Sequence, residues 1–150
     1  MPENIEICDT SFDPTAKLEA FTKANSEAGA ITSFLGQVRN EAGSVSELYL
    51  ESYPGVTEAG ILGAVEKAKA RWPLTGVMVI HRTGAMGVGE PIVLVATASK
   101  HRREAFKSCD YLMDYLKTEA VFWKRQKGAD GTQWIEPRAE DYKDNERWSK

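Results

Sequence analysis

The segment Ile92-Val93-Leu94-Val95-Ala96-Thr97-Ala98, followed by Ser99-Lys100-His101-Arg102-Arg103, decides the fold class. The residues before Ser99 form a continuous, mostly apolar run, which is typical of a buried strand. From Ser99 onward, apolar residues recur at helical spacing, at positions 105, 106, 109, 112, 113 and 116. This periodicity predicts an amphipathic helix with Ser99 as its N-cap and its last turn near Thr118.

Further elements are predicted on both sides of this strand and helix. The pattern places strands at 5–8, 30–36, 45–53 and 77–83, helices at 14–28 (with Asp13 as N-cap) and 56–72, and a hairpin at 121–126 and 132–135. The glycine-rich segment 84–89 is expected to be a connecting loop, and it matches no phosphate-binding loop because a strand follows it. The sequence therefore predicts one α+β domain over residues 1–150, with a mixed or antiparallel sheet, about three helices and a mobile tail at 136–150.

The composition is that of an ordinary globular protein, with 42% hydrophobic and 27% charged residues. No basic stretch followed by an apolar run is present at the N-terminus, and no apolar run is long enough to cross a bilayer. The two cysteines, Cys8 and Cys109, have neither the number of a disulfide framework nor the spacing of a zinc site. These features predict a cytoplasmic protein that holds no metal.

Cys109 is the cysteine whose role the sequence pattern indicates most clearly. It lies on the apolar stripe of the long helix, where a thiol is buried and unreactive. A catalytic thiol needs exposure and a lowered pKa. We therefore expect Cys109 to be a structural core residue and not a sulfur carrier.

Charge is distributed unevenly along the chain. The net charge is −3, yet residues 100–127 contain eight Lys and Arg against four Asp and Glu. A basic region on an acidic protein indicates a local site for a small anion, whereas nucleic-acid-binding domains are usually basic as a whole.

Two groups of basic residues are candidates for such a site. Lys100, His101 and Arg102 open the long helix, where free backbone N–H groups and the helix dipole also favour a phosphate. A solvated basic turn is the alternative interpretation. Arg39, just after a predicted strand, offers a guanidinium that can bind a phosphate or carboxylate with two hydrogen bonds.

Lys117 and Lys124 are the second group. Lys117 ends the long helix and Lys124 lies in the following strand, so a chain reversal near 119–120 would bring their ammonium groups together. Like charge and burial lower a lysine pKa, and such a lysine can act as a nucleophile or proton shuttle near neutral pH. The simpler alternative for Lys117 is a cation that stabilises the helix C-terminus.

The length of the helix limits how these groups can cooperate. His101 and Lys117 are separated by about 24 Å along the axis, at 1.5 Å per residue. One small-molecule pocket cannot use both ends of the same helix. Either the protein has two sites, or one site is assembled across a dimer.

The same residues carry a resemblance to a known family, the molybdopterin synthase catalytic subunits, over nearly the whole chain. The matching segments are 34–40 (FLGQVRN), 50–55 (LESYPG), 81–84 (HRTG), 89–90 (GE), 99–102 (SKHR), 105–106 (AF), 115–117 (YLK) and 122–125 (FWKR). The resemblance implies an α+β fold with a hammerhead-like β subdomain. It also implies a homodimer that carries one ubiquitin-like small subunit at each end, as a heterotetramer. The small subunit's C-terminal Gly-Gly thiocarboxylate would donate sulfur to cyclic pyranopterin monophosphate, forming the dithiolene of the molybdenum cofactor without any cofactor.

The resemblance also assigns roles to individual residues. Lys117 would be the main catalytic residue and Lys124 would assist it, while His101 and Arg102 would reach the substrate from the other subunit. The remaining substrate-binding positions would be Gln37, Val38, Arg39, Arg125 and Gln126. The family often has Glu at position 126, so Gln126 argues against a charged role there. The competing interpretation is a non-catalytic module that binds a phosphorylated metabolite, and an RNA-binding domain is disfavoured by the net charge.

Overall fold

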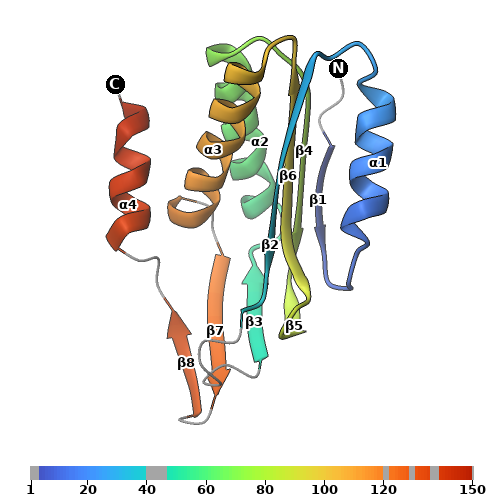
Figure 1. Ribbon diagram of the computed structural model, residues 1–150. Helices are drawn as coiled ribbons and strands as arrows, with labels where there is room; N and C mark the ends of the chain where they lie inside the picture. Colours follow the sequence, from blue (N-terminus) through green and yellow to red (C-terminus); the bar gives the residue numbers. More distant parts are fainter. Residues whose placement is uncertain (1–3, 40–46, 120–121, 129–130, 136–138, 150) are drawn as a thin grey trace.

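Two four-stranded sheets organise the chain, of which the computed structural model describes residues 4–39, 47–119, 122–128, 131–135 and 139–149 (Figure 1). The elements in order are β1 (Asn4–Cys8), α1 (Pro14–Ala24), β2 (Ala30–Gln37), β3 (Glu47–Ser52), α2 (Val56–Arg71), β4 (Leu74–Arg82), β5 (Gly84–Gly87), β6 (Pro91–Ser99), α3 (Arg102–Thr118), β7 (Phe122–Gly128), β8 (Gly131–Ile135), α4 (Ala139–Glu146) and the 3-10 turn η1 (Arg147–Ser149). The predicted α+β class is confirmed.

The first sheet has the order β1-β4-β6-β2 and is covered by helices on both faces. β1 pairs with β4 in parallel, whereas β4 with β6 and β6 with β2 are antiparallel. Alternate residues of β4 and β6 point to opposite faces. Val79 and Val95 belong to the cluster with α2 and α3, whereas Ile80 and Leu94 pack with Phe21 of α1. This two-sided burial explains the continuous apolar runs in the sequence.

The second sheet, β5-β3-β7-β8, is antiparallel and lies below α3 in Figure 1. A small apolar cluster of Val38, Leu48, Leu50 and Met86 packs on one side of it. The prediction of a loop at 84–89 was wrong for β5. Met86 is 1% exposed and pairs with Leu48, so burial of this side chain holds the glycine-rich segment in a strand.

The sequence predicted the N-cap residue correctly for α1 but not for α3. Asp13 caps α1, accepting hydrogen bonds from the Thr15 and Ala16 amides, as predicted. Ser99 is not the N-cap of α3. It is the last residue of β6, fully buried, and its hydroxyl donates to the Pro73 carbonyl, so the helix begins after His101.

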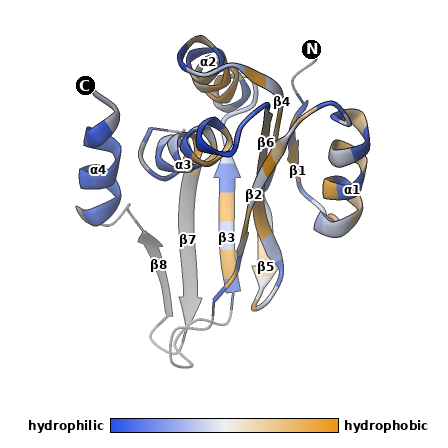
Figure 2. Ribbon diagram, turned by 45° about the horizontal axis from the view of Figure 1, so that its top comes forward, coloured by the Kyte–Doolittle hydropathy of each residue, from blue (hydrophilic) through white to orange (hydrophobic). Residues whose placement is uncertain are grey.

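Residues 139–149 form α4 and η1, in the segment whose charge predicted a tail that is mobile unless a partner orders it. α4 is mostly hydrophilic (Figure 2), but it packs beside α3. Arg147 and the Trp148 indole both donate to the carboxylate of Asp114 on α3. Arg71 donates to the Trp148 carbonyl and lies over its ring. A few specific contacts therefore hold a segment that has no apolar face of its own. None of the described helices is both long and apolar enough to span a membrane.

Candidate functional site

The direction of α3 decides which candidate residues can meet. Thr97 near the end of β6 donates to the Ala105 carbonyl, and Cys109 lies against the carbonyl of Val95, further back along the strand. Residue numbers therefore rise along α3 as they fall along β6, so the two elements are antiparallel. The C-terminal turn of α3 lies at the end of the first sheet where β6 begins and β4 ends.

Lys117 lies in that last turn of α3, exposed to solvent. Lys124 follows on β7, with its backbone paired to Leu50 of β3. Arg39 follows β2 at the same end, because Gln37 pairs with Pro91 and the Val38 amide donates to the Glu90 carbonyl. The fold thus places α3's C-terminal end, the start of β7 and the end of β2 in one region. β7 runs on in the direction of α3 (Figure 1), so the chain reversal expected near 119–120 was wrong, and the approach of the two ammonium groups stays a prediction.

Lys100, His101 and Arg102 lie at the opposite end of the same sheet. Ala30, the first residue of β2, pairs with Ser99 there, and a side chain on Gly29 would collide with the Lys100 carbonyl, so only glycine allows this approach. His101 and Arg102 are both exposed, and the His101 side chain makes no capping hydrogen bond. Arg102 and Lys117 are separated by about 22 Å along the helix. The structure therefore does not bring the two groups together within one chain.

His81 is buried in the lysine region, by which we mean the C-terminal end of α3 with Lys117, the start of β7 and the end of β2. The sequence did not reveal this position of His81. It is the penultimate residue of β4, is 7% exposed, and its ring stacks on Phe122 with 4.0 Å between centroids and 20° between planes. Burial first, and then the charge of Lys117, lower the pKa of His81 to about 4, against the opposing hydrogen bond to the Arg82 carbonyl. Its ring is therefore neutral at physiological pH.

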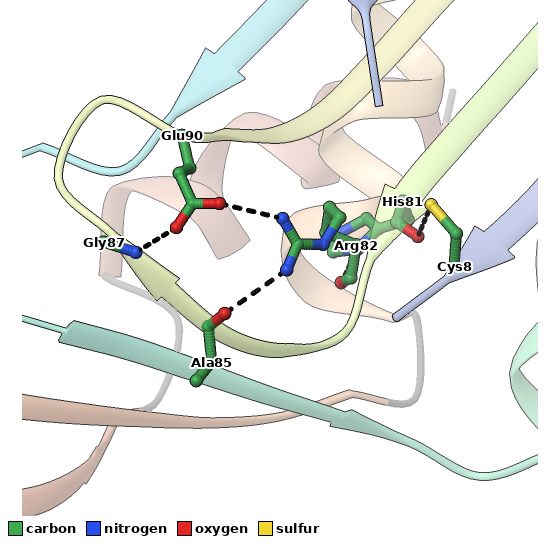
Figure 3. Close-up of polar contacts among 6 residues, drawn as sticks. All are labelled: Cys8, His81, Arg82, Ala85, Gly87 and Glu90. Carbon is green, nitrogen blue, oxygen red and sulfur yellow. Dashed lines mark hydrogen bonds and ion pairs between the residues drawn. The ribbon is translucent and has the colours of Figure 1, made fainter. Parts of the chain in front are cut away.

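Arg82, the next residue, joins the two sheets (Figure 3). Its side chain is 4% exposed and donates to the Glu90 carboxylate and to the Ala85 carbonyl, both at 3.3 Å. Glu90 also accepts from the Gly87 amide, and this bond, together with Arg82, holds the pKa of Glu90 below its usual range. The guanidinium thereby fixes β5 against the end of β4. Since β5 pairs with β3 and β3 with β7, the same contacts position the strand that carries Lys124.

Arg125 and Gln126 lie on β7, paired with Tyr49 and Leu48, but their side chains are outside the described part of the structure. Their assignment as pocket residues stays a prediction. Among the described residues, no group of three His, Cys, Asp or Glu side chains is arranged to hold a metal ion.

Cys109 lies on the buried face of α3, whereas Cys8 ends β1 beside His81 of β4. Cys109 is 4% exposed, as predicted, and burial, with a smaller contribution from Asp110, raises the pKa of its thiol to about 12. Burial also raises the pKa of Cys8, whose sulfur lies 3.8 Å from the His81 carbonyl oxygen. Thiols in these environments are poor nucleophiles.

We therefore expect both thiols to be dispensable for chemistry. A protein with Cys8→Ser and Cys109→Ala should keep its turnover rate within about twofold, while losing about 1 kcal/mol of stability from the core position. Turnover is measured well below the melting temperature, with circular dichroism as the control for folding. A folded double variant without turnover would instead indicate a persulfide on one of these cysteines.

Comparisons with known proteins agree with these features. The family model described as "MoaE protein" matches residues 7–119. The chain is 46% identical over 144 residues to the molybdopterin synthase catalytic subunit of Caulobacter vibrioides, covering 96% of each protein. The solved structure of the MoaE protein from Burkholderia ambifaria superposes with a TM-score of 0.85 at 39% identity, covering 99% of both chains. Molybdopterin synthase from Staphylococcus aureus gives a TM-score of 0.80 at 25% identity, covering 90% of this chain and 98% of that one.

Identity close to half of all positions, spread over almost the full length of both proteins, requires common descent and a common fold. The antiparallel α3 and β6, with Lys117 at the end of α3, lie within residues 7–119 that the family model matches, whereas β7 with Lys124 lies beyond them. This chain belongs to the family of molybdopterin synthase catalytic subunits.

Proposed function

We propose that this protein is the catalytic subunit of a molybdopterin synthase. It takes sulfur from the C-terminal thiocarboxylate of a ubiquitin-like small subunit and transfers it to cyclic pyranopterin monophosphate. Two transfers form the dithiolene that later binds molybdenum, and each leaves the small subunit with a carboxylate in place of its thiocarboxylate. The observation that carries the proposal is that Lys117 of α3 and Lys124 of β7 lie on either side of one short connection, in a chain of this family.

Lys117 is the main catalytic residue of this proposal. A lysine can carry a proton to or from the substrate, or react covalently with a carbonyl group, and both reactions require the neutral amine at some stage. The exposed position of Lys117 at a helix end leaves it accessible to a substrate. Lys124 assists from β7, with Arg125 and Gln126 as further pocket residues.

The phosphate of the substrate is bound partly by the other subunit. Arg39 lies at the lysine end of its own chain, whereas His101 and Arg102 lie a helix length away, so they serve the lysines of a partner. The edge strand β2 supports association between copies, because Phe34 and Leu35 on it are 43% and 38% exposed. Exposed apolar residues on a sheet edge are typical of a surface that pairs with another chain. This arrangement supports a homodimer that carries one small subunit at each end, a heterotetramer.

The small subunit is expected to bind through its extended C-terminal tail, with the terminal group near Lys117 and Lys124. Removal of its last two glycines should weaken binding at least tenfold. The shortened tail still ends in a carboxylate, but this group no longer reaches the lysines and makes no charge-assisted contacts with them. Isothermal titration calorimetry with the full-length and truncated small subunits measures this difference. Equal affinities would contradict insertion of the tail.

The activity itself is tested by reconstitution. Purified protein is mixed with thiocarboxylated small subunit and cyclic pyranopterin monophosphate, and dithiolene is detected after oxidation to a fluorescent pterin. The control uses a small subunit that ends in an ordinary carboxylate, which has no sulfur to donate. Product in the first mixture and none in the control is the expected result, and no product in either would contradict the proposed function.

A further inference from the structure

His81 lies where three parts of the lysine region meet. It belongs to β4, the central strand that pairs with β1 on one side and β6 on the other. Its ring covers Phe122, the first residue of β7, and its pKa is sensitive to the charge of Lys117 on α3. The residue therefore connects the first sheet to the start of β7, the strand that carries Lys124.

Phe122 lies at the end of β7 where the pairing with β3 is weakest. Its pairing with Ser52 is the last pair of the ladder between β3 and β7, and the ends of ladders open more readily than their centres. Phe122 is also half-buried against the cluster shared by α2 and α3. The flat face of His81 at 4.0 Å is a contact that limits movement of this strand end relative to β4.

The orientation of the His81 ring is itself fixed. Nδ1 lies 2.9 Å from the Arg82 carbonyl oxygen, and a carbonyl only accepts hydrogen bonds, so Nδ1 carries the proton of the neutral ring. Arg82 is held in turn by Glu90 and Ala85. The ring on which Phe122 rests is thus oriented by the backbone of Arg82, the residue whose side chain joins the two sheets.

We propose that His81 is a positioning residue for sulfur transfer: its ring holds Phe122, and with it the start of β7, at a fixed place beside the last turn of α3. Lys124, two residues along β7, thereby keeps its place relative to Lys117. The inference rests on the proposed function, because it takes both lysines to act on one substrate. His81 itself touches neither substrate nor sulfur.

Two substitutions separate the ring face from its hydrogen bond. His81→Phe keeps a flat ring and loses the Nδ1 donor, whereas His81→Asn keeps a donor close to the Nδ1 position and loses the ring. Positioning by stacking predicts that His81→Phe keeps kcat within about threefold. His81→Asn should lower kcat at least tenfold. The upper limit is roughly a hundredfold, which is what a displacement of about 1 Å can cost. KM for the pterin and affinity for the small subunit should change less than threefold in both.

Phe122→Leu provides a second, independent test. It removes the other ring of the stack, so it should lower kcat as His81→Asn does, and the double variant should be no slower than either single one, because both remove the same contact. Ile80→Ala is the matched control for lost stability. Ile80 is adjacent in β4 and fully buried, but it packs towards α1. Its kcat per folded molecule should equal that of the wild type.

Each alternative outcome contradicts the inference in a different way. Equal losses in His81→Phe and His81→Asn would mean that the ring nitrogens act in the chemistry, and wild-type kcat in both would mean that His81 only stabilises the fold. Additive losses in the double variant would mean that the two rings act separately. If the wild-type protein itself formed no dithiolene, the proposed function and not the role of His81 would be contradicted.

Discussion

Replacement of Lys117 with arginine should lower the rate of dithiolene formation by about 10²–10⁴-fold, the usual contribution of a positioned proton-transfer group. Arginine keeps the positive charge and the length of the side chain. Its pKa is above about 12, however, so it neither releases a proton near neutral pH nor reacts as an amine. The substitution therefore removes the chemistry of Lys117 while preserving its charge at the end of α3.

Single-turnover measurements with saturating small subunit give the rate, and calorimetry with the pterin gives the affinity. Affinity should fall less than threefold, which separates loss of chemistry from loss of binding. Lys107→Arg is the matched control, because Lys107 is also exposed on α3 but lies away from its last turn. A Lys117→Arg protein that forms dithiolene at the wild-type rate would favour a module that only binds a phosphorylated metabolite.

Mixing two inactive variants should restore activity to about a quarter of the wild-type level. Arg102→Ala and Lys117→Ala homodimers should each be nearly inactive, because every site lacks one required residue. In a symmetric dimer, each site takes Arg102 from one chain and Lys117 from the other. A mixed dimer therefore collects both lesions in one site and has one intact site. Equal random mixing makes about half of the dimers mixed, with one of their two sites active.

The control for this experiment uses the two lysines. Lys117 and Lys124 serve the same site from the same chain, so a mixture of Lys117→Ala and Lys124→Ala dimers leaves one lesion in every site and should stay inactive. Native mass spectrometry confirms that subunits have exchanged in both mixtures. Background activity in the Arg102 and Lys117 mixture, with mixed dimers present, would show that the site is not shared between chains.

Local patterns in the sequence were sufficient for most of the architecture. Asp13 before Pro14 places the start of α1, and the stripe that includes Cys109 places the buried face of α3, because both signals lie within one or two helical turns. β5 was missed because four residues with two glycines show no strand pattern. Only pairing with β3 and burial of Met86 make it a strand.

The distance between the two groups of candidate residues could also be predicted. The separation of His101 from Lys117 follows from helix geometry alone and is confirmed by the position of the two ends of α3. The contact between His81 and Phe122 was not predictable. It joins residues far apart in the chain, and a histidine at the end of a buried strand has the same local pattern whether it stacks on a ring or faces solvent.

The pairing of the first sheet also determines the order in which the chain can fold on the ribosome. The only described partner of β1 is β4, so β1 can pair only after β4 has been synthesised, since Asn4 pairs with Met78. In the same way, β2 can pair with β6 only after β6 has been synthesised, since Ala30 pairs with Ser99. At about 5–20 residues per second, each strand emerges roughly 4–15 seconds before its partner. Unpaired strands with apolar side chains such as Phe34 and Leu35 are prone to aggregate during that interval. We therefore expect the yield of native protein to depend on translation speed as well as on the stability of the finished sheet.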